Sequence, residues 1–122
     1  MQTYILFTKL STDLSYELKN RKRQGRAWME QVKAKCPEVK FLAHYAILGE
    51  YDFIDIYEAP DPETAAKVSI ISQEHGALHA KSMLAIPYKR FLELTDEIWS
   101  AEITKAGIEA HAFLPPAFFE LT

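Results

Sequence analysis

Apolar residues follow a strand-like pattern in four segments of the chain. The first segment, residues 3–8, is β-branched and aromatic, which is typical of a central strand buried on both faces. Residues 39–48 and 51–58 form two more, separated only by Gly49 and Glu50. Glycine at the first of two loop positions suits a type II′ turn, so these two segments predict an antiparallel hairpin. The fourth segment covers residues 78–86 and stops before Pro87.

Helical spacing of apolar residues separates these strands. Residues 11–13 offer N-cap side chains for a first helix, in which Gly25 could cause a break. Its apolar positions are Leu14, Leu18, Trp28, Met29 and Val32. A second helix begins with Asp61 as N-cap and Pro62 at the first helical position, and it ends at Gly76. A third helix is predicted over residues 88–106.

The element order is therefore βαββαβ followed by a C-terminal helix and an apolar tail. This order predicts an α+β, ferredoxin-like fold, with a four-stranded antiparallel sheet and two helices on one sheet face. The opposite, open face of the sheet is left uncovered. We expect one ferredoxin-fold domain over residues 1–95 and a helical extension with a tail over residues 96–122.

Composition narrows the classes of protein to consider. With 122 residues, 48% of them hydrophobic and 25% charged, the chain matches a globular domain. Its net charge of −3 gives no general attraction to nucleic acid, and the basic run at residues 20–26 favours a solvated helix face over a phosphate site. A single cysteine, Cys36, forms no internal disulfide. Without a signal-like or membrane-spanning segment, we expect a cytoplasmic protein that binds no membrane.

One motif resembles a known family. The run GEYDFIDIYEAPD at residues 49–61 resembles the motif of the GYD-domain family, with Gly49, Tyr51 and Asp52 as its letters. The runs TYILFTKLS and HYAILG are similar to that family too, and the resemblance covers roughly residues 1–95. It implies a fold of the dimeric α+β-barrel type, in which two sheets face each other. That superfamily includes cofactor-free monooxygenases, isomerases, haem enzymes and ligand-sensing domains, so the fold does not choose a function.

The hairpin predicts which side chains share a sheet face. With a two-residue turn, one side receives four cross-strand pairs: Leu48 with Tyr51, Ala46 with Phe53, His44 with Asp55, and Leu42 with Tyr57. The other side receives a more uniformly apolar set: Phe41, Ala43, Tyr45, Ile47, Ile54 and Ile56. We therefore assign the second set to the helix-covered core and the first set to the open face.

The first set of residues predicts a ligand pocket on the open face. Tyr51, Phe53 and Tyr57 would be its aromatic walls, and Asp55 would orient His44 as a general base. The same pair could instead be a satisfied polar contact in a dimer interface. His79 could join the open face from the fourth strand.

The remaining candidates are not expected to form a catalytic, metal or cofactor site. We interpret Asp52 as a structural turn residue. His75 and His79 are separated by Gly76, which ends the helix between them, so no metal site is expected. Phosphate-loop and dinucleotide motifs are missing from the sequence, and no cofactor is expected.

Two functions remain open after the sequence has been read. The protein is either an oligomeric binding or accessory module, with an aromatic or apolar ligand, or a small cofactor-free monooxygenase or isomerase that uses His44 and Asp55. A haem-binding variant with His44 or His79 as ligand is a third alternative. In each case we expect a homodimer or higher homo-oligomer, because an apolar open face marks an interaction site. The apolar tail at residues 111–122 is expected to dock on another subunit, over the cavity, or on its own domain.

Overall fold

The computed structural model describes residues 1–11 and 18–106, with side chains for residues 1–11 and 21–100. The chain divides into two compact units, Met1–Ala85 and a second unit that begins at Ile86. Each unit is described by itself.

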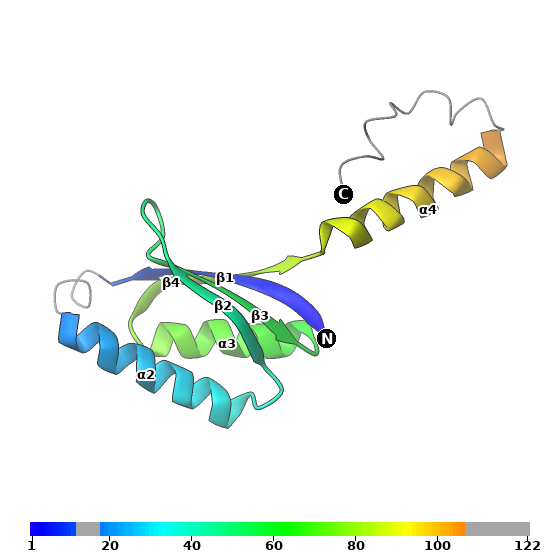
Figure 1. Ribbon diagram of the computed structural model, residues 1–122. Coiled ribbons are helices and arrows are strands. Elements are labelled where there is room, and N and C mark those ends of the chain that lie inside the picture. The colour runs from blue at the N-terminus through cyan, green and yellow to red at the C-terminus, as the bar shows by residue number, and fades with distance from the viewer. Residues whose placement is uncertain (12–17, 107–122) are drawn as a thin grey trace. The chain divides into compact units, whose positions relative to one another are not determined.

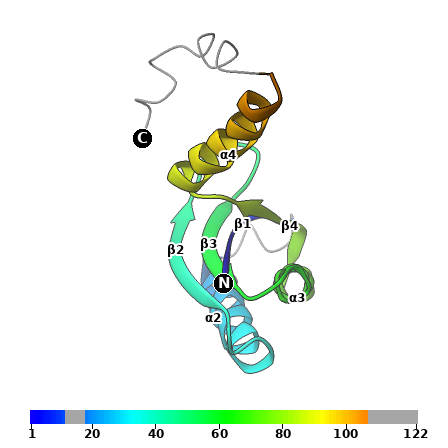
Figure 2. The same cartoon turned by 90° about the vertical axis from the view of Figure 1, so that its right-hand side faces the viewer.

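The first unit is built on one four-stranded antiparallel sheet (Figure 1). Its strands are β1 (Gln2–Leu10), β2 (Lys40–Ala46), β3 (Phe53–Ala59) and β4 (Ala77–Ala85). They lie in the order β2-β3-β1-β4, which Figure 2 shows across the sheet. The predicted central position of the first strand is confirmed. One face of β1 is buried, with Tyr4, Leu6 and Thr8 at most 9% exposed, while the alternate residues Ile5 and Phe7 are only half-buried.

Two helices, α2 (Leu18–Lys35) and α3 (Pro62–Glu74), lie on the same side of the sheet (Figure 1). Asp61 caps α3 as predicted, because its carboxylate accepts a hydrogen bond of 2.8 Å from the backbone N–H of Thr64. Gly76 follows the helix with a φ of 99°, a conformation that favours glycine. Helix α2 runs through Gly25 without a break. The α+β, ferredoxin-like prediction is confirmed.

The core lies between the sheet and the two helices. Its residues come from β1, β3, α2 and α3: Tyr4, Leu6, Val32, Cys36, Tyr57, Ala59, Ala65, Val68 and Ile71. Trp28 packs edge-on against Phe41, and Phe41 lies against Tyr57, with ring centroids 5.3 and 5.8 Å apart. Removing these side chains from water is the main favourable contribution to the folding of this unit.

The register of the β2–β3 hairpin was predicted in part. His44 pairs with Asp55 and Ala46 with Phe53, as expected. Strand β2 ends at Ala46 and β3 begins only at Phe53. The connection between them is therefore longer than the predicted two-residue turn. The register then shifts between Phe41 and Ala43, so that Phe41 and not Leu42 faces Tyr57. A β-bulge of this kind gives one strand an extra residue and moves the side chains beyond it to the other face.

The predicted assignment of the two sheet faces is wrong. Asp55 and Tyr57 are 2% and 0% exposed and lie on the helix-covered side, whereas Ile54 and Ile56 point to the open face. The apolar count misled the assignment because the two polar side chains of β3 on the covered side have partners there: Asp55 has His44, and the Tyr57 hydroxyl has Ser82.

The open face is the side of the sheet turned away from α2 and α3. Cross-strand pairing places its residues in rows, and the apolar ones in the strands are Ile5, Phe7, Ala43, Tyr45, Ile54, Ile56, Met83 and Ala85. One row runs from Tyr45 through Ile54 and Phe7 to Lys81, and Tyr45 and Met83 are 58% and 52% exposed. His79 pairs with Lys9 and therefore lies on the open face, and its role in ligand binding stays a prediction.

The second unit contains α4 (Tyr88–Ala106), the predicted third helix. Tyr88 and Phe91 stack with ring centroids 6.2 Å apart, and Arg90 forms ion pairs with Glu93 and Glu97. Phe91 and Ile98 are 49% and 68% exposed. The predicted docking of the tail at residues 111–122 lies outside the described residues. Within the described ranges, none of the helices has the length and apolar character needed to cross a bilayer.

Candidate functional site

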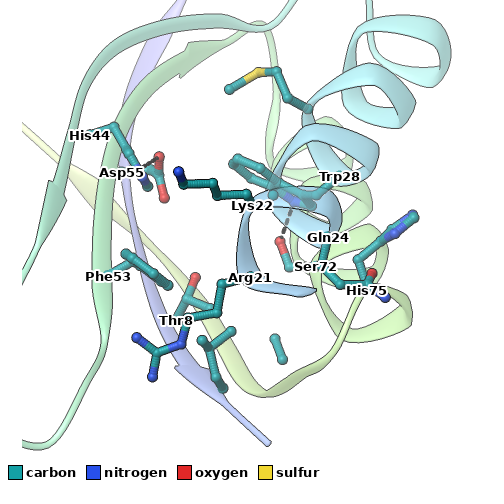
Figure 3. Close-up of a pocket in the computed structure, with 14 residues that line it drawn as sticks. Thr8, Arg21, Lys22, Gln24, Trp28, His44, Phe53, Asp55, Ser72 and His75 are labelled. Atoms are coloured by element: carbon teal, nitrogen blue, oxygen red, sulfur yellow. Dashed lines mark hydrogen bonds and ion pairs between the residues drawn. The ribbon is translucent and has the colours of Figure 1, made fainter. Parts of the chain in front are cut away.

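A cavity of about 530 Å³ opens between helix α2 and the sheet (Figure 3). Strand β1 contributes Thr8 to its wall, β2 contributes His44, and β3 contributes Phe53 and Asp55. Helix α2 supplies Arg21, Lys22, Gln24, Trp28 and Met29. Its size falls within the range of small-molecule pockets, roughly 300–1,000 Å³.

The sheet wall carries the predicted His-Asp pair. His44 Nδ1 lies 2.5 Å from Asp55 Oδ1, and the side chain of Asp55 is 3% exposed while that of His44 is 57% exposed. The His44 ring also stacks on Phe53, with centroids 5.5 Å apart. Asp55 and Phe53 thus hold the imidazole by one ring nitrogen and one ring face, while more than half of the side chain stays accessible to solvent.

Burial controls the chemistry of this carboxyl. It raises the pKa of Asp55, because an ionised carboxylate is poorly solvated there, and the charge and hydrogen bond of His44 act in the opposite direction. An imidazole that donates its Nδ1–H to a carboxylate presents Nε2 as a proton acceptor. The pair can therefore bind a polar ligand group or accept a proton from one.

The opposite wall is fixed by hydrogen bonds between helices α2 and α3. The Trp28 indole N–H donates to Ser72 Oγ at 2.7 Å, and the Ser72 hydroxyl donates to the Val68 carbonyl at 2.9 Å. His75 Nε2 lies 2.5 Å from Gln31 Oε1 at the end of α3. These contacts hold the Trp28 ring, an apolar surface of the cavity, in one orientation.

Arg21 and Lys22 bring positive charge to the cavity. Both line it, Arg21 half-buried and Lys22 exposed at its edge, whereas the exposed Arg23 and Arg26 of the same basic run do not. Figure 3 shows the Lys22 side chain extending toward Asp55, and that of Arg21 directed to the region of Thr8. The basic run, which the sequence assigned to a solvated helix face, is thus divided between the cavity and solvent.

The other predicted site residues lie apart from the pair. Only Phe53 shares its cavity. Tyr57 belongs to the core, where its hydroxyl lies 2.6 Å from Ser82 Oγ and burial raises its pKa to about 12. Tyr51 lies on the open face against Phe7, with ring centroids 5.3 Å apart, and with the ammonium of Lys81 6.0 Å from its ring centre. The prediction of one pocket for all these residues is wrong.

The motif residues build the hairpin connection. Gly49 has a φ of 133°, which favours glycine. Asp52 accepts a hydrogen bond of 2.8 Å from the Leu10 N–H through its carboxylate, and its own backbone N–H donates to the Thr8 carbonyl at 2.8 Å. Asp52 therefore ties the hairpin to the end of β1, which is consistent with the structural role predicted for it.

Sequence reasoning missed the helical half of the cavity. Helical spacing places Trp28 and Met29 among the apolar positions of a helix, and it carries no signal for Ser72, yet all three line the cavity. The signal that was available is a tryptophan beside a basic run, since a Trp on a half-covered helix often pairs an apolar ring with a polar partner. Among residues 1–11 and 21–100, no three His, Cys, Asp or Glu side chains come together as a metal site.

Comparison with known proteins identifies a family and a relative of this chain. Residues 4–95 match the family model described as the GYD domain. A protein of Thermus thermophilus named "Glutamine synthetase and cystathionine beta-lyase binding protein" is 32% identical over 88 residues, which cover 71% of this chain and 90% of the relative.

Solved structures are also similar to the chain. A hypothetical protein from Pyrococcus horikoshii has a TM-score of 0.45 and 25% identity, and the match covers 71% of this chain and 92% of that protein. A Thermus thermophilus protein has a TM-score of 0.45 and 20% identity over 71% of this chain and 95% of its own.

Proposed function

We propose that this chain, which belongs to the GYD-domain family, functions as an accessory binding protein. It associates with itself through the open face, binds other proteins, and holds a small molecule in the cavity beneath α2. The observation that carries the proposal is the open face, where cross-strand pairing brings apolar residues together. Figure 1 shows that α2 and α3 both lie on the other side of the sheet.

The open face supports self-association by its composition. Ile5 pairs with Ile56 on one side and with Met83 on the other, so apolar residues continue across three strands. Contiguous apolar surface of more than a few hundred Å² marks an interaction site in soluble proteins. A second copy is the partner that best fits, since a two-fold axis brings such a patch against itself.

The relative supports binding to other proteins. Its name describes a protein that binds glutamine synthetase and cystathionine β-lyase, and this chain spans 90% of its length. We propose the same class of partner, a metabolic enzyme, for this chain. The cavity lies on the other side of the sheet from the open face, so a ligand there need not leave when two subunits associate.

Light scattering after size-exclusion chromatography tests self-association. The wild type should be a dimer or larger at micromolar concentration. Ile56→Lys places a charge in the open face and should shift the protein to monomer, because a buried unpaired ammonium is costly. The matched control is Ile70→Lys, which changes an isoleucine of α3 that is 54% exposed. A monomeric wild type, or equal effects of both variants, would contradict the proposed interface.

Binding to enzymes is tested by immobilising the full chain and titrating glutamine synthetase and cystathionine β-lyase of its own organism. Saturable binding of either supports the proposal. Failure of both would limit the function to self-association and ligand binding.

An alternative function follows from the His44–Asp55 pair. A half-exposed imidazole oriented by a buried carboxylate in a cavity is a suitable general base, so the chain could be a cofactor-free monooxygenase or isomerase. Turnover of a cavity ligand that is lost in His44→Gln, with ligand binding retained, would favour this enzyme. Binding without turnover favours the accessory protein.

A further inference from the structure

We propose that the cavity beneath α2 is a site for an aromatic carboxylate, a small molecule with a flat apolar ring and one acidic group. This inference rests on the small-molecule site of the proposed function and names the chemical class of its ligand. Three features of the cavity wall carry it: the charges, the rings and the exposed imidazole.

The charges of the described wall favour an anion. Arg21 and Lys22 are cationic, and Asp55 is the one acidic residue among the described lining residues. Its carboxylate is 3% exposed and faces His44 at 2.5 Å, so it is already engaged with a protein group. The whole chain carries a net charge of −3, which makes this positive wall a local feature rather than a property of the surface. An ammonium group such as that of Lys22 is a usual partner of a ligand carboxylate.

The rings of the wall favour a flat apolar body. Trp28 comes from α2 and Phe53 from β3, on two sides of the cavity (Figure 3). Each ring is held in place before a ligand arrives, Trp28 by Ser72 and Phe41, and Phe53 by stacking with His44. Preformed aromatic walls bind a ring at low entropic cost, because little side-chain freedom is lost on binding. A volume of about 530 Å³ leaves room for a ring system with a short acidic group.

The imidazole adds a polar contact. The Nδ1 atom of His44 faces Asp55, and its side chain is 57% exposed, so Nε2 is accessible to a hydroxyl or carboxylate on the ligand ring. A molecule that carries only an apolar ring would leave this nitrogen and the Lys22 ammonium without ligand partners. The cavity should therefore distinguish acids from their uncharged analogues.

Isothermal titration calorimetry with a matched pair of probes tests the proposal. The probes are 2-naphthoate and 2-naphthamide, which share one ring system and differ in charge. We expect the wild-type chain to bind 2-naphthoate roughly tenfold more tightly than 2-naphthamide, because a charge-assisted hydrogen bond replaces a neutral one. Lys22→Gln should reduce the affinity for 2-naphthoate about tenfold and leave that for 2-naphthamide unchanged.

Arg23→Gln is the matched control, since Arg23 follows Lys22 on the same helix, is exposed, and does not line the cavity. It should bind both probes as the wild type does. Equal affinity of the wild type for the two probes would overturn the choice of an anion while leaving a small-molecule site in place. Equal losses in Lys22→Gln and Arg23→Gln would reduce the effect to general electrostatics. If neither probe binds, both this inference and the small-molecule site fail, whereas self-association stands on its own test.

Discussion

Replacing Tyr57 with Phe tests whether this residue is a core residue, as the structure has it, or a pocket wall. The Tyr57 side chain is fully buried, and its hydroxyl lies 2.6 Å from Ser82 Oγ. Removing the hydroxyl at neutral pH should lower the free energy of unfolding by about 1 kcal/mol. The cost stays modest because Ser82 keeps a second partner, the hydroxyl of Ser69 at 2.9 Å.

High pH should remove the stability advantage of the wild type over Tyr57→Phe. The pKa of Tyr57 rises from 10.0 to about 12 on folding, chiefly through burial. The folded protein therefore keeps the phenol neutral where the unfolded chain ionises it. This contribution to stability is complete below about pH 10 and is lost at about 1.4 kcal/mol per pH unit as the pH rises toward 12. Tyr57→Phe lacks this loss, so the two proteins should become equally stable near pH 11.

Urea denaturation followed by circular dichroism, at one protein concentration and at several pH values from neutral to about 11, measures the difference. Tyr88→Phe removes the hydroxyl of a half-exposed tyrosine in α4 and should follow the wild type at every pH. If the difference between wild type and Tyr57→Phe stays constant up to pH 11, the hydroxyl is accessible to water and the assignment of Tyr57 to the core is wrong.

Two further predictions concern acidic residues. Because burial raises the pKa of Asp55 above 3.8, the folded state binds a proton more readily than the unfolded chain, and stability should fall as the pH rises from about 4 through the raised pKa. Asp55→Asn should lose this dependence in urea titrations between about pH 4 and pH 7, and an unchanged slope would contradict the burial. Asp52→Ala should lower the free energy of unfolding by about 1–2 kcal/mol and speed hydrogen exchange of the Leu10 amide, which loses its acceptor. Glu50→Ala, an exposed change in the same connection, should do neither.

The sequence was sufficient for the element order and for part of the hairpin register. Local signals decide both: the Asp61 cap, the positive φ at Gly76, and the alternation that places His44 opposite Asp55. These signals act over a few residues and do not depend on what packs against them. The fold class follows, because few arrangements bury strands and helices in this order.

The face of the sheet that carries the site could not be read in the same way. The number of apolar residues on each face usually distinguishes the buried face of a sheet from the face exposed to solvent. Here the open face is itself apolar, so this number favoured the wrong face. The buried polar groups are stable only because of partners from distant segments, Ser82 for Tyr57 and Ser72 for Trp28. No local sequence signal predicts the β-bulge in β2, which moves Phe41 to the covered side.

The strand order bears on how the chain reaches its native state. Strand β1 is the earliest of the four to be synthesised, yet its two neighbours in the sheet are β3 and β4, which come later. During translation the apolar segment YILF of β1 stays unpaired until β3 or β4 has been synthesised, whereas β2 and β3 can form their hairpin with each other. Such non-local pairing slows folding and exposes aggregation-prone strands in the interval. Yield in a cell should therefore depend on growth temperature and chaperone supply as well as on the stability of the folded domain.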